Sequence, residues 1–418
     1  MDITIKPSAL SGAVTAPPSK SMAHRAILAA ALAKGESVIK NIELSEDIRA
    51  TAGAIRLMGA NTEFKDGTLI VTGIKYFSKN TFIDCGESGT TLRLLIPVLA
   101  ATGGGTVTGR GRLPERPVQE YLKIFDKQNI AYRRGGSNLP LTVGGGLKSG
   151  RFALSGAVSS QYISGLLFAL PLLTGDSEIV IEDTLESGGY VDMTLQTLRM
   201  SGIEIAEIEK YRRYTVTGSQ TYKPCDCTVE GDWSQAAFFL LAGAAGGDIT
   251  VKGLNAETLQ KDSAFIGLLK QMGADITAGT DGIRVTKSSL HAVSADVSQT
   301  PDIAPVLAGA MAIARGKSVI TGGARLKVKE SDRIAATASA LNAIGAKVTP
   351  ASDGFVIEGV PHLKGGVSRS YNDHRIAMTL ACLLPVCQGE VTIADAQAVD
   401  KSYPSFYKEL QKLGGNIL

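Results

Sequence analysis

Histidine and cysteine are scarce in this chain, with four His and five Cys among 418 residues. Only Cys225 and Cys227 lie close together, in the stretch CDC, and this spacing does not fit a zinc knuckle. Cys85, Cys382 and Cys387 stand alone. We therefore expect reduced, mostly structural thiols and no protein-bound metal.

Long apolar runs and an excess of one charge are also lacking. No uninterrupted apolar run reaches membrane-spanning length, and the N-terminal stretch MDITIKPSAL lacks the layout of a signal peptide. The 43 basic and 40 acidic residues give a net charge of +3, which argues against nonspecific binding to nucleic acid or membranes. We expect a cytoplasmic protein, or a plastid one expressed without its transit peptide.

Glycine, in contrast, is abundant, with 47 residues, and part of it is periodic. One series ends apolar runs and opens short β-type segments: Gly35, Gly105, Gly175, Gly247, Gly316 and Gly389. A second series lies in stretches such as LMGAN and QMGAD: Gly59, Asn129, Gly202, Gly273, Gly345 and Gly414. Within each series, neighbours are 69 to 73 residues apart. The chain is therefore predicted to contain six copies of one unit.

Each copy reads as helix, strand, helix, strand. The first helix is apolar on nearly all sides, as in SQAAFFLLAGAAGG, so it must be buried, and its closing glycine suits a left-handed C-cap. The second helix is amphipathic, as in SDRIAATASALNAIGA, and should cover the outside. Two groups of three copies fit the usual size of a domain.

The buried helices carry polar residues at their N-terminal ends, in PSKS, CGESGT, VSSQ, GDWSQ, QTPDIA and NDHR. Good N-caps explain some of these residues, and we favour that interpretation for Ser234. N-caps do not explain the basic residues at these positive helix ends, which are Lys20, Arg25, Arg93, His374 and Arg375. Helix N-termini with added cations favour anionic ligands, so this set predicts a binding surface for anions.

Single segments leave two interpretations open. In SKSMAHR, residues 21, 24 and 25 share a helical face, which suits an anion or a solvated basic turn. The loop GRLPERPV and the stretch AVSSQY are equally ambiguous alone. In LKVKESDR, two interpretations of Glu330 are open. Glu330 and Arg333 form an ordinary i, i+3 helix pair, or Glu330 is a general acid or base and the cations around it determine its pKa.

Taken together, eight segments resemble the 5-enolpyruvylshikimate-3-phosphate (EPSP) synthase family in order and spacing: PPSKSMAHRAILAAALAKG, GESGTTLR, ERPV, VSSQY, TPDIAP, VKESDR, NDHRIAM and DKSYPSF. The resemblance implies an α/β fold of two pseudo-threefold domains. Each domain would hold three βαβαββ units around buried parallel helices, the inside-out α/β barrel of enolpyruvyl transferases. It also implies that residues 1–17 join 230–418, that 18–229 form the inserted domain, and that the active site lies in a cleft that closes on substrate.

The family's activity would be transfer of the enolpyruvyl group of phosphoenolpyruvate to the 5-hydroxyl of shikimate 3-phosphate, in the biosynthesis of chorismate and aromatic amino acids. The residues implied to hold shikimate 3-phosphate are Lys20, Ser21, Arg25, Ser159, Ser160, Gln161, Ser187, Tyr190, Asp302 and Lys329. Those implied to hold phosphoenolpyruvate are Lys20, Gly89, Thr90, Arg116, Gln161, Arg333, Arg375 and Lys401. The catalytic set would be Asp302 as base, Glu330 assisted by Lys20 as acid, and His374 near the leaving phosphate. The resemblance implies no metal, no cofactor, a monomer, and no partner beyond the two small-molecule substrates.

Two residues depart from the family pattern. Glu87 replaces an Asn found in some members, and Arg325 replaces an Asn before VKE, so both are left out of the site. Gly89 with the following TTLR resembles the form that leaves room for the inhibitor glyphosate. The related UDP-N-acetylglucosamine enolpyruvyl transferase is the nearest alternative, but it uses a cysteine in the loop corresponding to GRLPERP, which has none. A repeat-built nucleic-acid clamp would need a basic surface on all repeats, which the balanced charge disfavours.

Overall fold

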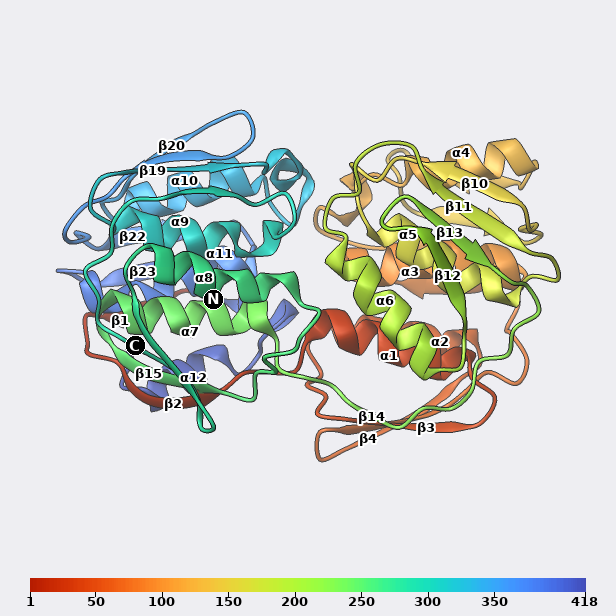
Figure 1. Ribbon diagram of the computed structural model, residues 1–418, viewed down its shortest axis with the longest axis horizontal. Coiled ribbons are helices and arrows are strands. Elements are labelled where there is room, and N and C mark those ends of the chain that lie inside the picture. The colour runs from red at the N-terminus through yellow and green to blue at the C-terminus, as the bar shows by residue number, and fades with distance from the viewer. The chain divides into compact units, whose positions relative to one another are not determined.

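The computed structural model describes residues 1–418, which form two compact units. Unit 1 combines Met1–Pro17 with Glu230–Leu418, and unit 2 is Pro18–Val229. Each unit contains three four-stranded sheets together with a set of helices (Figure 1).

The helices of unit 2 are α1 (Lys20–Leu32), α2 (Glu46–Met58), α3 (Gly89–Thr102), α4 (Gln119–Gln128), α5 (Gln161–Ala169) and α6 (Gly189–Met200), with short 3₁₀ turns η1 (Leu113–Glu115) and η2 (Leu170–Leu172). Its strands are β3 (Glu36–Lys40), β4 (Asn61–Lys65), β5 (Thr68–Thr72), β6 (Thr81–Asp84), β7 (Gly104–Thr108), β8 (Tyr132–Arg134), β9 (Leu141–Gly144), β10 (Arg151–Leu154), β11 (Ser177–Ile181), β12 (Ile205–Glu209), β13 (Arg213–Val216) and β14 (Cys227–Thr228).

The helices of unit 1 are α7 (Trp233–Gly246), α8 (Ala264–Gln271), α9 (Ala304–Ala312), α10 (Arg333–Ala343), α11 (His374–Cys382) and α12 (Phe406–Lys412). Its 3₁₀ turns are η3 (Lys261–Ser263), η4 (Pro301–Ile303), η5 (Ala324–Val328), η6 (Leu384–Val386) and η7 (Ala396–Lys401). Its strands are β1 (Ile3–Lys6), β2 (Ser11–Thr15), β15 (Asp248–Lys252), β16 (Asp275–Gly279), β17 (Gly282–Thr286), β18 (Ser294–Asp296), β19 (Lys317–Thr321), β20 (Lys347–Pro350), β21 (Phe355–Glu358), β22 (Gly366–Arg369), β23 (Val391–Ala394) and β24 (Asn416–Ile417).

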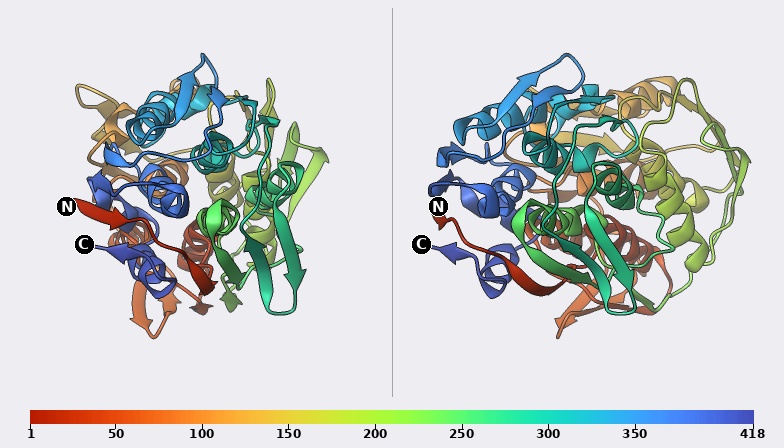
Figure 2. Two further views of the ribbon diagram at one scale, coloured as in Figure 1. Left: turned by 90° about the vertical axis from the view of Figure 1, so that its left-hand side faces the viewer. Right: turned by 60° about the vertical axis from the view of Figure 1, so that its left-hand side comes forward.

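All six sheets follow one pattern, which confirms the sixfold repeat. In the sheet β6-β7-β9-β8, the first pair is parallel and the other two pairs are antiparallel. The parallel pair is joined through a buried helix, α3, because parallel neighbours need a crossover connection. The sixth sheet, β22-β23-β1-β24, is completed by the N-terminal strand β1, which pairs with both β23 and β24. The two chain ends therefore lie close together (Figure 2).

The repeat contains more strands than the sequence predicted. After each outer helix in unit 2, for example, the chain forms an antiparallel hairpin such as β4–β5 and then a third strand such as β6. The βαβαββ pattern implied by the family resemblance is therefore confirmed, and the single strand expected from the local pattern is wrong. The hairpin strand β4 reads NTEFK and is largely exposed, so it lacks the buried alternation by which strands are recognised.

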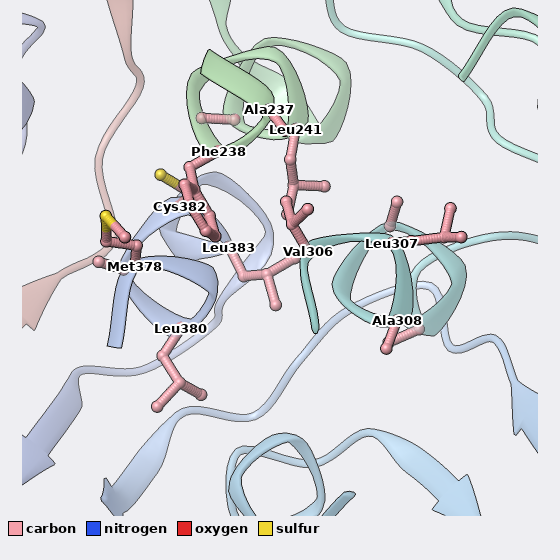
Figure 3. Packing of buried hydrophobic residues seen from close by; sticks show 14 of the residues in the cluster. Ala237, Phe238, Leu241, Val306, Leu307, Ala308, Met378, Leu380, Cys382 and Leu383 are labelled. Carbon is pink, nitrogen blue, oxygen red and sulfur yellow. The ribbon is translucent and has the colours of Figure 1, made fainter. Parts of the chain in front are cut away.

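The apolar helices are buried as predicted. In α7, every residue from Trp233 to Ala245 is buried, and the hydrophobic core of unit 1 surrounds it. Figure 3 shows Leu241 of α7, Val306 of α9 and Leu383 at the end of α11 packed together. A Cβ on Gly309 of α9 would lie 2.8 Å from the Thr379 side chain of α11, so glycine permits this close approach. The packing holds the N-terminal ends of these helices in place.

The two glycine series differ in backbone conformation. All six positions of the second series have positive φ: Gly59, Asn129, Gly202, Gly273, Gly345 and Gly414. In the first series only Gly35 and Gly316 do, and neither is a helix cap, because α1 is capped by Ala33 and α9 by Ile313. The predicted left-handed C-cap is present at Gly103, which ends the buried helix α3 with a φ of 119°. It is wrong for α7, which Gly247 caps with a φ of −97°. None of the helices has both the length and the apolar character that a membrane crossing requires.

Candidate active site

Helix α1 begins the candidate site in unit 2, and its Arg25 is held rigidly. The buried guanidinium donates to Thr194 Oγ1 at 2.8 Å, to the Tyr190 carbonyl at 2.9 Å and to the Ser21 carbonyl at 2.6 Å. Burial lowers the pKa of Arg25 to about 10, so the side chain stays cationic at neutral pH. Three fixed acceptors hold this charge beside the hydroxyl-bearing first turn of α1.

Lys20 lies one residue before Ser21, at the start of α1. Its ammonium group donates to the Asp47 carboxylate of α2 at 2.7 Å, and both side chains are largely buried. The amine and the carboxylate come from residues 27 positions apart. This pairing orients the Lys20 amine at the helix start.

His24 connects α1 to the N-terminal end of α3. Its Nδ1 lies 2.6 Å from Thr51 Oγ1, which is 2.6 Å from Thr91 Oγ1, and Thr91 donates to Ser88 Oγ at 2.8 Å. Burial, and then the charges of Lys20 and Arg25, hold the pKa of His24 well below its usual value. His24 is therefore neutral at pH 7 and acts as a structural link between two helix starts.

Gln161 at the start of α5 connects to α3. Its Nε2 donates to Thr90 Oγ1 at 2.8 Å, and its Oε1 accepts from Arg93 Nη1 at 2.9 Å. Pro97 in α3 cannot donate to the Arg93 carbonyl, and the Tyr121 hydroxyl donates to it instead, at 2.7 Å. The proline thus leaves a carbonyl free for Tyr121, and this hydrogen bond anchors the N-terminal half of α3.

Gly89 leaves space that an arginine fills. A Cβ at Gly89 would lie 2.3 Å from Arg116 Nη1 and 3.4 Å from Arg93 Nη1. Any larger residue here would displace these side chains. The two guanidinium groups therefore meet the N-terminal end of α3, where the helix dipole adds further positive potential.

Three serines lie at or near the other helix starts of unit 2. Ser159 Oγ accepts from the Gln161 backbone N–H at 3.3 Å, and Ser160 is the N-cap residue of α5. Ser187 precedes α6, is buried and has a φ of 55°. Its carbonyl accepts from the backbone N–H of Tyr190, whose ring lies 5.8 Å from the Arg25 guanidinium carbon. These serines bring hydroxyl groups to the ends of α5 and α6.

Asp302 lies at the centre of the candidate site in unit 1. Its carboxylate accepts from Arg333 Nη1 at 2.9 Å, Arg375 Nη2 at 3.0 Å and Lys329 Nζ at 3.4 Å. Burial alone would raise the pKa of this carboxyl, but the three cations outweigh burial and hold it well below its usual value. Asp302 is therefore ionised and strongly hydrogen-bonded.

Arg333, at the start of α10, is buried among carboxylates. Besides Asp302, it donates to Glu330 Oε2 at 2.7 Å and to Asp373 Oδ2 at 2.8 Å. Burial opposes its charge, but the attraction of Asp373, Glu330 and Asp302 outweighs this effect and raises its pKa above the usual value. The Glu330–Arg333 pair of the sequence analysis is present, as one part of a larger network.

Lys329 differs from the other cations of the network. Burial is the largest influence and lowers its pKa to about 8, although Asp302 attracts its charge. Its side chain is one-quarter exposed. An amine with this pKa can gain or lose a proton near neutral pH, as a general acid or base requires.

Helix α11 begins in the same network. Asp373 is its N-cap, accepting from the Arg375 backbone N–H at 3.0 Å, while its other oxygen accepts from Ser331 Oγ at 3.0 Å and from Arg333. His374 is buried, with Nδ1 3.9 Å from Asp373 Oδ1. Arg375 also donates to Ser234 Oγ at 3.2 Å.

Ser234 is not the N-cap that the sequence analysis favoured. The cap of α7 is Asp232, which accepts from the Gln235 backbone N–H, while Ser234 donates to Asp232 and accepts from Arg375. Lys401, in η7, is buried and donates to the Asn372 carbonyl at 2.7 Å, next to the α11 cap. Hydrogen bonds thus link the starts of α7, α10 and α11 with η4 and η7.

Within unit 2, the structure brings together ten predicted residues with Lys20: Ser21, Arg25, Gly89, Thr90, Arg116, Ser159, Ser160, Gln161, Ser187 and Tyr190. Arg116, which follows η1, lies against Gly89 at the start of α3, and the others lie in or just before the N-terminal parts of α1, α3, α5 and α6. Within unit 1, it brings together Asp302, Lys329, Glu330, Arg333, His374, Arg375 and Lys401. Glu87 and Arg325 are the two residues that depart from the family pattern. A Cβ on Gly111 would contact the Glu87 side chain. Arg325 donates to the Ser298 carbonyl at 2.6 Å.

The sequence analysis missed the partners that orient these residues. Asp47 holds Lys20, Thr194 holds Arg25, and Asp373 joins α10 to α11. Asp373 belongs to the stretch NDHR at a predicted helix start, but its pairing with Arg333, 40 residues away, has no signal in a single sequence.

Comparison with known proteins agrees with this arrangement. A family model described as EPSP synthase (3-phosphoshikimate 1-carboxyvinyltransferase) matches residues 5–410. The 3-phosphoshikimate 1-carboxyvinyltransferase of Clostridium novyi is 45% identical over 427 residues, covering 100% of this chain and 98% of the relative. The protein of the same name from Clostridium perfringens is 45% identical over 417 residues, covering 99% and 98%.

A solved structure of EPSP synthase from Acinetobacter baumannii superposes with a TM-score of 0.82 at 29% identity, covering 100% of this chain and 99% of that one. The match spans both units, all six repeats and every segment that carries a candidate site residue. The chain therefore belongs to the EPSP synthase family.

Proposed function

We propose that this chain transfers the enolpyruvyl group of phosphoenolpyruvate to the 5-hydroxyl of shikimate 3-phosphate and releases phosphate. The observation that carries the proposal is the whole-chain identity of about 45% to relatives named 3-phosphoshikimate 1-carboxyvinyltransferase. UDP-N-acetylglucosamine is not favoured as the acceptor, and the GRLPERP loop lacks a cysteine.

Shikimate 3-phosphate carries a carboxylate and a phosphate, and unit 2 offers a separate group of donors for each. We assign the carboxylate to Ser21 and Arg25. We assign the phosphate to Ser159, Ser160 and Ser187, and the ring to Gln161 and Tyr190. The rigid hydrogen bonds of Arg25 support this assignment, because a preorganised cation spends little free energy on ordering when it binds.

Phosphoenolpyruvate needs several cations because it approaches a second anionic substrate. As the family resemblance implies, we assign it to Lys20, Gly89, Thr90, Arg116, Gln161, Arg333, Arg375 and Lys401. Fixed cations lower the repulsion between the substrates and place the reacting atoms together. These cations also neutralise the phosphate charge, so the reaction as proposed needs no metal.

The chemistry is an addition followed by an elimination. In the addition, the 5-hydroxyl oxygen bonds to C2 of phosphoenolpyruvate, the hydroxyl proton passes to a base, and another proton is added at C3. The product is a tetrahedral intermediate with a methyl group. In the elimination, the bond from C2 to the phosphate oxygen breaks and a methyl proton is lost, which restores the double bond.

Asp302 and Lys329 are assigned to the attacking hydroxyl. Asp302 is ionised and accepts the hydroxyl hydrogen bond, but its low pKa makes it a weak proton acceptor by itself. Lys329, with a pKa of about 8, lies 3.4 Å from that carboxylate and can take up or return the proton. The two groups therefore act as a pair.

Glu330 is assigned as the acid that protonates C3, with assistance from Lys20. His374 is assigned beside the leaving phosphate, together with Arg375. His374 is buried next to the α11 cap, which fits a role in positioning Arg375 as well as contact with phosphate. We also expect a monomer in the cytoplasm, which size-exclusion chromatography and cell fractionation can test.

The function is tested by phosphate release from phosphoenolpyruvate with each acceptor in turn. We expect release with shikimate 3-phosphate and none with UDP-N-acetylglucosamine. Release with the sugar nucleotide alone would overturn the proposed function.

A further inference from the structure

Four sulfur-bearing side chains line one small cavity in unit 2. They are Cys225, Cys227, Met22 and Met200, and the cavity has a volume of about 40 Å³. The rest of the lining is mainly small or apolar, from α1, α6 and the segment that contains β14. This volume suits a single ion, because a water molecule needs roughly 10–15 Å³ by the same measure.

We propose that this cavity binds a soft monovalent metal ion, copper(I), through the sulfur atoms of Cys225 and Cys227 together with a thioether of Met22 or Met200. Thiolates bind copper(I), zinc and iron–sulfur clusters, and a methionine thioether favours copper(I) among these because zinc takes thiolate, imidazole and carboxylate ligands. The spacing of the CDC pair predicts no protein-bound metal because it does not fit zinc, and a single sequence carries no signal that two methionines share a cavity with this pair.

The backbone presents the two cysteines on one side. The segment runs beside β3: Cys225 N–H donates to Ser37 Oγ at 3.1 Å, and Cys227 pairs with Ile39. Residues two apart on an extended segment point to the same face, and their Cα atoms lie about 6.6 Å apart. Both side chains can therefore reach one ion in the cavity that they line.

The surroundings of the two thiols favour a cation. Asp226 lies between them, and its carboxylate accepts from the Val38 backbone N–H at 2.9 Å. Binding of copper(I) displaces two protons: two S–H bonds break, two S–Cu bonds form, and the protons pass to the buffer. No change of oxidation state is involved.

The site is distinguishable from the other thiols of the chain. Cys85, Cys382 and Cys387 are buried in the cores, whereas Cys225 and Cys227 are partly exposed. Met200 lines the cavity and is about half exposed to solvent.

The test is anaerobic titration of the full chain with copper(I) in competition with bicinchoninate. We expect one ion per chain, and at least a hundredfold weaker binding in Cys225→Ser and in Cys227→Ser. The double variant Met22→Leu/Met200→Leu should bind about tenfold more weakly. Thr228→Ala is the matched control, because it alters the same lining without removing sulfur, and it should bind as the unaltered chain does.

Retained enolpyruvyl transfer in each variant shows that the fold is intact, because none of these residues is assigned to substrate. Copper(I) should also protect Cys225 and Cys227, mapped by mass spectrometry, from alkylation by iodoacetamide. The proposal is wrong if the chain does not compete with bicinchoninate, or if the two single cysteine variants bind copper(I) undiminished. Unchanged affinity in the double methionine variant would rule out the thioether ligand.

Discussion

Asp373 is the residue whose replacement most directly tests the electrostatic network of unit 1. It is fully buried, caps α11 and accepts hydrogen bonds from Arg333 and Ser331. In Asp373→Asn the side-chain shape remains, but the negative charge beside Arg333 is lost. One amide oxygen then replaces two carboxylate oxygens, so the cap and the arginine compete for it.

The expected cost follows from the contacts that disappear. A hydrogen bond to a charged group contributes about 1.5–3 kcal/mol, so Asp373→Asn should destabilise unit 1 by about 2 kcal/mol. Asp373→Ala also removes the cap, and leaves Arg333 with only Asp302 and Glu330 as partners. Removing one partner of a buried ion pair costs about 3–5 kcal/mol, and we expect a loss in that range.

The assay uses the only tryptophan of the chain, Trp233, which lies at the start of α7 in unit 1. Its fluorescence during urea unfolding reports the unit that contains Asp373. Asp332→Asn is the matched control: Asp332 caps α10 in the same unit, and Asn caps helices as well as Asp. The reasoning is refuted if Asp373→Asn and Asp332→Asn unfold at the same urea concentration.

Four further predictions concern catalysis and binding. Asp302→Asn and Glu330→Gln should each lower kcat by roughly 10²–10⁴-fold with unchanged circular dichroism, because general acid–base catalysis contributes that much; near-normal kcat would remove the residue from the mechanism. The pKa of Lys329 is lowered to about 8, so its side chain is protonated below that pH and neutral above it. A plot of kcat against pH should therefore show an inflection near pH 8, and Lys329→Arg should abolish it. The same inflection in the variant would contradict the assigned role of Lys329. In Arg25→Lys, the lysine cannot reproduce the three hydrogen bonds to Thr194, Tyr190 and Ser21. A loss of about 1.5–3 kcal/mol of binding free energy should raise KM for shikimate 3-phosphate roughly tenfold or more. An unchanged KM would show that Arg25 does not bind this substrate. Removing divalent metals with EDTA should leave the rate unchanged, and a loss restored by added metal would contradict the assigned roles of Lys20, Arg116 and the other cations.

Much of the fold could be predicted because the same pattern recurs six times. The positions of Gly59, Gly202 and their equivalents recur because each outer helix ends in a residue with positive φ. The helix starts with Lys20 and Arg375 were recognisable because a cation at a positive helix end needs an anionic partner. These features depend on local sequence, which is why a single chain reveals them.

The features that escaped prediction depend on packing between distant segments. Lys20 meets Asp47 across 27 residues, and Arg333 meets Asp373 across 40. The first pair joins the two helices of one repeat and the second joins two neighbouring repeats, and no local pattern encodes either contact. The strand β4 was not predicted for another reason: it is largely exposed, and its sequence lacks the alternation of apolar and polar residues that a half-buried strand would show.

The central claim is enolpyruvyl transfer by addition and elimination, and one experiment tests it most directly. Phosphoenolpyruvate and shikimate 3-phosphate are incubated with the protein in D₂O, and the products are followed by ³¹P and ¹H NMR. Because C3 becomes a methyl group in the intermediate, the account predicts inorganic phosphate together with an enolpyruvyl ether at the 5-oxygen whose methylene group carries deuterium. Absence of that ether, or an ether without deuterium in its methylene group, would contradict the account.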